Sequence, residues 1–239
     1  MELEGASALV TGAGRGIGRA IALTLARAGL RVTAVSRTAP ELESLVREIE
    51  GAGGRAVAFA GDVRQTPACD AAVARAVDAH GGLHVLVNNA GVGAVTPVAE
   101  TSDEQWDAVL TTNLTAVFRL TRAALPHLTR SGGHVIMISS LAGSNPVSGM
   151  AAYCASKAAL DHFARCLMLE VRYQRVKVTV VAPGSVETSF GAGRTSSVAS
   201  PSRLRSEDVA EAVMDLLRTR DDAHVSRVEL RPLRPNKQG

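Results

Sequence analysis

The feature that most constrains the fold is a regular alternation of short aliphatic runs with longer segments of helical periodicity. Each run is rich in β-branched residues and apolar throughout, which is typical of strands covered on both faces. The runs are residues 7–11, 31–36, 56–60, 85–88, 134–139, 177–182 and 227–230. The segments between them predict helices over 16–28, 39–51, 66–80, 103–129, 151–173 and 206–218. This order predicts a doubly wound α/β fold, a parallel sheet of about seven strands with helices on both faces, as one domain over residues 1–239.

Composition excludes several classes of function. Hydrophobic residues make up 46% of the chain and aromatic residues 3%, so the core is aliphatic and few rings can stack on bases. The net charge is +3, but the arginines are spread singly, which argues against nucleic-acid binding. We find no apolar segment of about 18 residues, no signal peptide and no zinc-binding cysteine spacing. We therefore expect a soluble, cytoplasmic protein with no metal, membrane or nucleic-acid partner.

A glycine-rich turn, TGAGRGIG, follows the first predicted strand and opens the first helix. Glycines at such a turn let the backbone approach a pyrophosphate, whose charge the free N–H groups of the helix stabilise. An ordinary tight turn is the alternative, and the absence of GK[ST] disfavours a P-loop. The predicted nucleotide-binding residues here are Gly12, Gly14, Arg15, Gly16, Ile17 and Gly18.

The end of the second predicted strand indicates which dinucleotide is bound. A carboxylate there would bind a free ribose 2′-hydroxyl, but this strand ends in Ser36 and Arg37. An arginine suits a 2′-phosphate instead, and Arg15 in the glycine turn can reach the same phosphate. Each arginine alone could be a solvated surface charge, but together they favour NADP(H) over NAD(H).

Two further strand ends carry candidate cofactor contacts. Asp62 and Val63 follow the third strand, where the acid either accepts a hydrogen bond from the adenine amino group or caps a helix. Asn89, Ala90 and Gly91 close the fourth strand. Their amides would tie strands together while the glycine leaves room for the adenosine ribose, the alternative being a simple turn.

A tyrosine and a lysine one helical turn apart form the candidate catalytic pair. Tyr153 precedes Lys157 by four residues within AAYCASKAAL, so both side chains share one face of a helix. An ammonium group beside a phenol lowers the phenol's pKa from about 10 towards working pH. The pair therefore predicts general acid/base chemistry on an alcohol or carbonyl.

The motifs TGAGRGIG, NNAG, YCASK and PGSVET together resemble the short-chain dehydrogenase/reductase family, strongly over residues 5 to about 190. The resemblance implies a Rossmann-type fold and an NADP(H)-dependent oxidoreductase, which moves a hydride between nicotinamide C4 and a ketone, aldehyde or secondary alcohol. It implies that Tyr153 is the proton donor and acceptor, and that Lys157 lowers its pKa and binds the nicotinamide ribose. The family's serine, thirteen residues before the tyrosine, corresponds to Ser140 rather than Ser139.

The same resemblance implies further contacts. Asn113 corresponds to an asparagine that helps hold a water joining Lys157 to solvent. The helices over 103–129 and 151–173 correspond to those that form a homodimer or homotetramer. The nicotinamide-side residues implied by the family are Pro183, Gly184, Val186 and Thr188.

The substrate side is less constrained. Residues 184–205 form a polar stretch that we interpret as a substrate-side lid. The candidate pocket walls are Leu141, Asn145, Val147, Met150 and Phe190. They are mostly apolar and predict a carbonyl reductase for a neutral, hydrophobic substrate, although any of them could be ordinary packing.

Three other functions remain as alternatives. The tail over residues 225–235 lacks the glycine pair with which family members often end, which weakens the alternative of a 3-oxoacyl-thioester reductase. A non-catalytic NADP(H)-binding sensor or a methyltransferase would have no use for the Tyr153–Lys157 pair.

Overall fold

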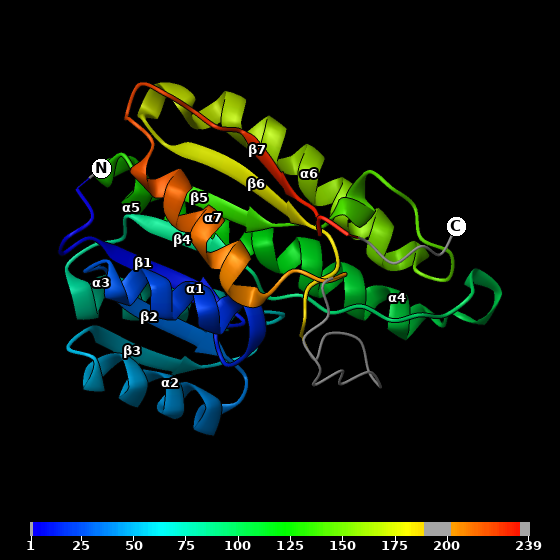
Figure 1. The fold of residues 1–239 in the computed structure, drawn as a ribbon, viewed down its shortest axis with the longest axis horizontal. Helices are drawn as coiled ribbons and strands as arrows, with labels where there is room; N and C mark the ends of the chain where they lie inside the picture. Colours follow the sequence, from blue (N-terminus) through cyan, green and yellow to red (C-terminus); the bar gives the residue numbers. More distant parts are fainter. Residues whose placement is uncertain (1, 189–201, 235–239) are drawn as a thin grey trace.

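The computed structural model describes residues 2–188 and 202–234, and within them one parallel sheet has the strand order β3-β2-β1-β4-β5-β6-β7. Its strands are β1 (Ser7–Thr11), β2 (Arg31–Ser36), β3 (Arg55–Ala60), β4 (Val85–Asn88), β5 (His134–Ile138), β6 (Lys177–Pro183) and β7 (Arg227–Leu230). Their arrowheads point the same way in Figure 1, so all carboxyl ends meet at one edge. The chain builds outward from β1 to β3 and then returns to start β4 on the other side of β1. Open α/β sheets bind ligands at such a reversal.

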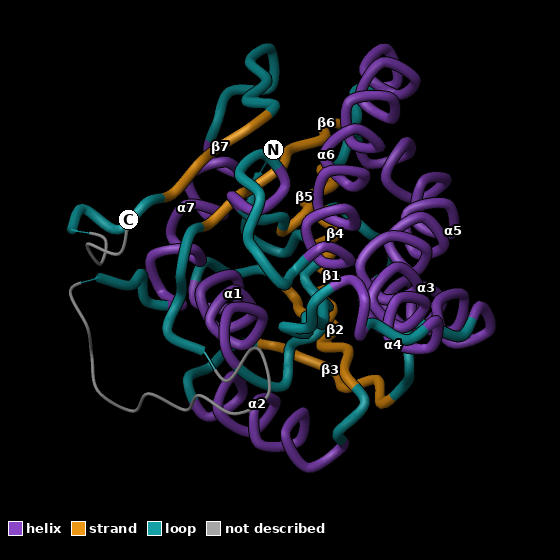
Figure 2. Tube along the Cα trace, turned by 90° about the vertical axis from the view of Figure 1, so that its right-hand side faces the viewer, coloured by secondary structure: helices purple, strands orange, loops and turns teal. Residues whose placement is uncertain are grey.

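Helices cover both faces of this sheet, as predicted. They are α1 (Gly16–Arg27), α2 (Ala39–Gly51), α3 (Thr66–His80), α4 (Asp103–Leu110), α5 (Ala116–Ser131), α6 (Ala151–Val171) and α7 (Ser206–Arg218). The helices α1, α2 and α7 lie on one face, and α3, α5 and α6 lie on the other (Figures 1 and 2). None of the helices in the described part of the chain is long and apolar enough to cross a membrane.

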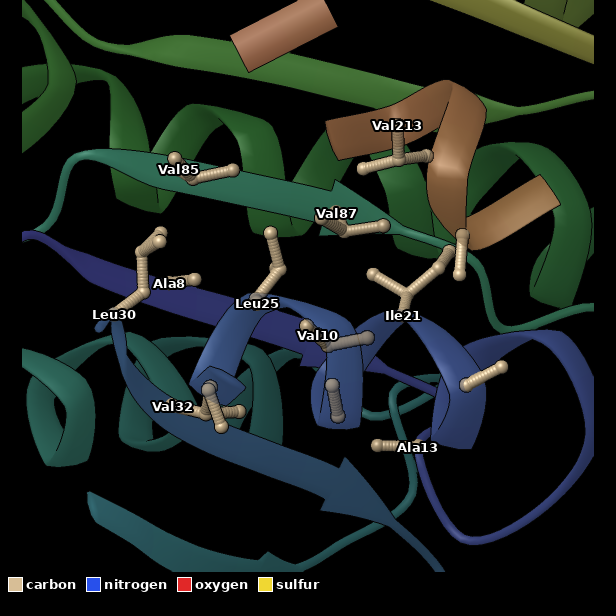
Figure 3. Packing of buried hydrophobic residues seen from close by; sticks show 14 of the residues in the cluster. Ala8, Val10, Ala13, Ile21, Leu25, Leu30, Val32, Val85, Val87 and Val213 are labelled. Carbon is tan, nitrogen blue, oxygen red and sulfur yellow. The ribbon is translucent and has the colours of Figure 1, made fainter. Parts of the chain in front are cut away.

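Two aliphatic cores, one on each face, explain the uniformly apolar strands. Ala8 and Val10 of β1 point towards α1, where they meet Ile21 and Leu25 (Figure 3). Leu9, between them in sequence, belongs to the cluster under α3, α5 and α6. Each central strand therefore needs apolar residues at consecutive positions.

One predicted helix is wrong in a way that matters for the site. The segment 103–129 is two α-helices joined by a π-helical turn over Thr111–Thr115. The wider turn contains Asn113, whose side chain is fully buried and binds the backbone of Val92. A π-helical turn inserts one residue into the helical repeat, which helical periodicity alone does not reveal. The prediction over 151–173 also ran too long, because α6 ends at Val171 and a 3₁₀ turn follows.

Candidate active site

The glycine turn between β1 and α1 leaves no space for side chains. Gly12 and Gly16 have φ angles of +64° and +56°, which favour glycine. A Cβ on Gly12 would lie 2.9 Å from Asn89 Nδ2 and 3.0 Å from Ala90 Cα, and one on Gly16 would lie 3.2 Å from Thr188 Cγ2. The bare backbone at the start of α1 therefore forms a cradle that fits a pyrophosphate. Gly18 packs closely on the Gly12 carbonyl.

An acid that the sequence analysis did not consider lies beside this turn. A Cβ on Gly14 would lie 3.1 Å from both Glu41 Cβ and Ser36 Oγ, and the Glu41 carboxylate is closer still. Glu41 belongs to the first turn of α2. Its position four residues after Arg37 was the available signal, because it brings the first turn of α2 back to the end of β2.

The two arginines predicted to bind a 2′-phosphate are available for a ligand. Arg15 and Arg37 are both exposed at the carboxyl ends of β1 and β2. Within residues 2–188 and 202–234, neither side chain has a hydrogen-bond or ion-pair partner. Arg37 is near enough to Asp62 to help lower the pKa of that carboxyl group. The two arginine side chains fit a phosphate, although the Glu41 carboxylate beside Gly14 adds a negative charge to the same corner.

Asp62 binds Arg64 rather than a helix terminus. Arg64 Nε donates to both carboxylate oxygens, at 2.9 and 3.1 Å, and the Arg64 amide donates to Oδ1 at 3.0 Å. The side-chain hydrogen bond from Arg64 lowers the pKa of Asp62. The alternative prediction of a helix N-cap is wrong, because Gln65 occupies the N-cap of α3. Val63 is buried below the pair.

The Asn89 segment ties β4 to β1, as expected of an amide-rich strand end. Asn89 Nδ2 donates to Thr11 O at 2.8 Å. Thr11 Oγ1 accepts hydrogen bonds from the Asn89 and Ala90 amides at 3.0 and 3.1 Å. The sequence analysis missed Thr11, although its place at the end of β1 was a usable signal. A Cβ on Gly91 would lie 3.8 Å from Lys157 Nζ, so this segment also borders the candidate catalytic lysine.

Ser140, Tyr153 and Lys157 lie together where β5 meets α6. Ser140 caps the 3₁₀ turn Leu141–Gly143, and its Oγ accepts from the Ala142 amide at 3.1 Å. Ser140 also lies close enough to Tyr153 for its side chain to help lower the pKa of the phenol. Lys157 Nζ lies 5.7 Å from the centre of the Tyr153 ring and donates to Ile138 O at 2.8 Å.

Ser139, the neighbour of Ser140, faces the interior instead. It is 3% exposed, and its Oγ is buried with no hydrogen-bond partner in the described part of the chain. Consecutive residues of an extended chain point to opposite sides. The serine thirteen residues before Tyr153 is therefore the one that faces the phenol.

The predicted lowering of the Tyr153 pKa is wrong for this structure. Burial raises the pKa of the phenol, and the Ser140 side chain offsets only part of this effect. Burial also lowers the pKa of Lys157 to about 8, because the fully enclosed ammonium has lost its hydration. The sequence predicts the attraction between the Tyr153 phenolate and the Lys157 ammonium, but the desolvation of both groups depends on the fold.

Asn113 joins the π-helical turn to the catalytic helix. Its Oδ1 accepts from the Val92 amide at 2.8 Å, and its Nδ2 donates to Val92 O at 2.9 Å and to Ser156 Oγ at 3.0 Å. Ser156 Oγ in turn donates to Tyr153 O at 2.7 Å. The side-chain amide is therefore engaged in holding Val92 and Ser156, and the water expected near Asn113 stays a prediction. Ser156, within YCASK, was not singled out from the sequence.

The segment after β6 adjoins both the glycine turn and the Ser140 turn. A Cβ on Gly184 would lie 3.3 Å from Leu141 Cδ1, and Thr188 reaches Gly16 as described above. Val186 forms a bridge with Leu204, which joins the two described ends of the 184–205 stretch. Pro183 ends β6 and is buried.

The candidate substrate-side residues form an open, mostly apolar border. Leu141 and Met150 are partly buried, while Val147 is 46% exposed. Asn145 Nδ2 donates to Leu141 O at 3.1 Å, so this side chain closes its own turn. Phe190 lies outside the described residues. In the described part of the chain, no three His, Cys, Asp or Glu side chains are grouped as metal ligands.

Known proteins resemble this chain over the residues that carry the motifs described above. The model of the short chain dehydrogenase family matches residues 6–198. The 2,3-dihydro-2,3-dihydroxybenzoate dehydrogenase of Bacillus subtilis (strain 168) is 38% identical over 189 residues, which are 79% of this chain and 72% of that protein.

Solved structures resemble the whole chain. The alcohol dehydrogenase of the archaeon Thermococcus sibiricus, complexed with 5-hydroxy-NADP, matches with a TM-score of 0.91 and 29% identity over 97% of this chain and 99% of its own. A metagenomic short-chain oxidoreductase in complex with NADP matches with a TM-score of 0.85 and 39% identity over 97% and 99%.

Proposed function

The chain belongs to the short chain dehydrogenase family of oxidoreductases, and we propose that it transfers a hydride between NADP(H) and a ketone, an aldehyde or a secondary alcohol. Tyr153 is the general acid and base in this proposal. Ser140 orients the substrate oxygen, and Lys157 supplies the positive charge. Asn113 holds the catalytic helix in place.

One observation carries the proposal. Ser140 lies close enough to Tyr153 to act on the pKa of its phenol, and both residues lie beside a buried lysine and a glycine cradle. A carbonyl oxygen bound next to the two hydroxyl groups would accept a hydrogen bond from each. A purely nucleotide-binding protein would have no need of this arrangement.

The chemistry follows from the two protonation states. Nicotinamide, when bound, supplies or accepts the hydride. Ser140 polarises the carbonyl, and Tyr153 gives its proton to the oxygen as negative charge develops there. Because burial raises the pKa of Tyr153, the residue is protonated at neutral pH and ready to act as the acid in reduction. Lys157, charged below about pH 8, then stabilises the phenolate that remains.

The free arginines support NADP(H) as the cofactor. The fork of donors on Arg37 and Arg15 suits the extra phosphate of that cofactor, and two structural neighbours were obtained with NADP or 5-hydroxy-NADP. We expect Arg37→Asp to weaken NADPH binding at least about tenfold relative to NADH. Arg47→Asp, an equal charge change at an exposed position of α2, is the matched control. Unchanged NADPH affinity in Arg37→Asp would refute the phosphate contact.

The substrate class is tested by following NADPH absorbance with a panel of ketones, aldehydes, quinones and β-ketoacyl thioesters. The apolar border of Leu141, Val147 and Met150 predicts turnover of a neutral, hydrophobic carbonyl. A preference for the thioesters would instead support the 3-oxoacyl-thioester reductase alternative. NADPH binding without turnover of any compound would support the sensor.

We also propose a homodimer or homotetramer formed through α4, α5 and α6. Phe118 of α5 and Leu169 of α6 are 44% and 60% exposed, so both helices present large apolar side chains at the surface. Tyr173, just after α6, is 84% exposed. Light scattering on the purified protein tests this proposal, and a monomeric mass would contradict it. A cytoplasmic location remains a prediction.

A further inference from the structure

An ion pair between β7 and α6 lies directly behind the candidate catalytic residues. Arg227 Nη1 donates to Asp161 Oδ2 at 2.6 Å, and the Asp161 side chain is only 8% exposed. Asp161 follows Lys157 by one helical turn, so both lie on the same face of α6. Buried ion pairs lose much of their attraction to desolvation and are weak sources of stability. The location of this pair therefore points to a role other than stability.

The same guanidinium reaches the turn that carries Ser140. Arg227 Nη2 donates to Ser144 Oγ at 3.2 Å. Ser144 immediately follows the 3₁₀ turn of which Ser140 is the N-cap. One side chain from β7 thus holds both the catalytic helix and the catalytic turn.

Gly143 brings that turn into direct contact with the helix. A Cβ on Gly143 would lie 2.9 Å from Asp161 Oδ2 and 3.1 Å from the carbonyl carbon of Lys157. Real Cβ atoms almost never approach other atoms so closely. The turn and α6 therefore meet without an intervening side chain, at the level of Lys157 and Asp161.

We propose that Arg227 and Asp161 are positioning residues, which fix the Ser140 turn against α6 so that Ser140 and Tyr153 meet the same substrate oxygen. This inference rests on the proposed function, and neither residue touches the reacting atoms. It also gives a use to the segment 225–235, whose sequence differs from the usual ending of the family.

The charges around the pair support this role. Asp161 faces Lys157 on its own helix and Arg227 on β7, and Glu229 is the second partner of Arg227. Asp161 raises the pKa of Lys157 and so opposes the effect of burial. Asp161 Oδ1 is buried without a partner among the described residues. Loss of Arg227 would therefore leave a buried carboxylate unpaired and free to draw Lys157 away from Tyr153.

The test compares Arg227→Met, Arg227→Lys and Asp161→Asn in the full chain. We expect Arg227→Met and Asp161→Asn each to lower kcat by about 10- to 100-fold, the scale of a small misplacement of catalytic groups. The Kd for NADPH, measured by fluorescence, should rise much less than kcat falls, because the pair lies away from the glycine turn and only the contact of Lys157 with the cofactor is disturbed. Arg227→Lys keeps the charge but loses the second donor, so its kcat should fall only about three- to tenfold. The kcat of the double variant Arg227→Met with Asp161→Asn should be no lower than that of either single variant, because each single change already breaks the same ion pair.

Arg220→Met is the matched control, because Arg220 pairs with Asp222 at the surface, where the side chains are 82% and 71% exposed. It should leave kcat unchanged. A kcat within about threefold of wild type in folded Arg227→Met, or an NADPH Kd that rises in proportion to the loss of kcat, would overturn the inference. If Arg227→Met does not fold, Arg227→Lys and Ser144→Ala decide, and wild-type kcat in both overturns it. Failure of the proposed function looks different, because wild type would then reduce no carbonyl or Tyr153→Phe would remain active.

Discussion

Buried polar side chains at the two edges of the sheet differ in how fully their hydrogen bonds are satisfied. At the amino edge, Ser7 Oγ lies 3.0 Å from His84 Nδ1 and donates to Gly82 O at 2.6 Å. His134 Nε2 lies 2.8 Å from Thr179 Oγ1, which donates to Val225 O. At the carboxyl edge, Ser139 Oγ has no partner within the described chain, and Lys157 holds a single carbonyl.

This difference distinguishes side chains that stabilise the fold from side chains that serve the candidate site. The side chains of Ser7 and His84, and those of His134 and Thr179, satisfy one another and close the ends of strands, so their loss should destabilise the fold. At the carboxyl edge, the Ser139 hydroxyl and the Lys157 ammonium are buried at a cost that their own hydrogen bonds do not offset. We therefore expect substitution of Lys157 or Ser140 at the carboxyl edge to remove activity with little loss of stability, and substitution of His134 at the amino edge to do the reverse.

Lys157→Met should show the largest effect. We expect kcat to fall by about 1000-fold, because the phenolate left on Tyr153 loses the buried positive charge beside it. Burial lowers the pKa of Lys157 to about 8, so the folded state binds this proton more weakly than the unfolded chain does. Below pH 8 the charged lysine therefore costs stability, and the variant should melt at the wild-type temperature or higher.

Lys177→Met at the amino edge is the matched control for that variant. Lys177 Nζ donates to the Thr219 and Arg220 carbonyls, and its loss should leave kcat unchanged. An equal fall of kcat in both lysine variants would remove the distinction between the edges.

The neighbouring residues Ser139 and Ser140 test the same difference at the end of β5. Ser140→Ala should lower kcat by about 100-fold, since one of the two hydroxyl groups directed at the substrate oxygen is lost. Ser139→Ala should keep kcat and raise the free energy of unfolding by about 1 kcal/mol, because an unpaired buried hydroxyl is removed. Steady-state assays and urea unfolding measure the two effects, and the opposite assignment of the two serines would contradict the site.

His134→Leu should lower the free energy of unfolding modestly and leave kcat nearly unchanged. Thr179 gives its hydroxyl proton to Val225 O, so His134 Nε2 must carry the proton of the bond between them. Loss of this buried bond should lower the free energy of unfolding by about 1–2 kcal/mol, with kcat within about twofold. A large fall of kcat would show that the amino edge also serves the site.

The same histidine predicts how stability depends on pH. Burial lowers the pKa of His134 to about 3 and also lowers the pKa values of His80 and His84. The unfolded chain thus binds protons that the folded chain does not, so stability is full above about pH 6.5 and falls as pH decreases towards 3. We expect a loss of up to about 1.4 kcal/mol per pH unit for each buried histidine. Urea unfolding at about pH 7.5 and about pH 5 measures this loss, which should be smaller in His134→Leu.

The sequence predicted the parts of the molecule that local pattern determines. Strand positions came within a residue at each end, because two-sided burial makes each strand uniformly apolar, and the Tyr153–Lys157 pair follows from helical spacing alone. The π-helical turn at Asn113 and the pair of Asp161 with Arg227 were missed. The first breaks the helical period by a single residue, and the second joins positions 66 residues apart. The pKa of Tyr153 was predicted in the wrong direction, because burial depends on residues that only the fold brings together.

The central claim is that Tyr153 gives its proton to the substrate oxygen. The chain has two tyrosines, so Tyr153→Phe and Tyr173→Phe form a matched pair of variants, one partly buried and one exposed. NADPH oxidation with the best carbonyl of the panel, measured alongside NADPH affinity, tests the claim directly. We expect Tyr153→Phe to lose at least about 1000-fold in kcat with NADPH affinity unchanged, and Tyr173→Phe to keep both. Turnover of Tyr153→Phe within about tenfold of wild type would contradict it.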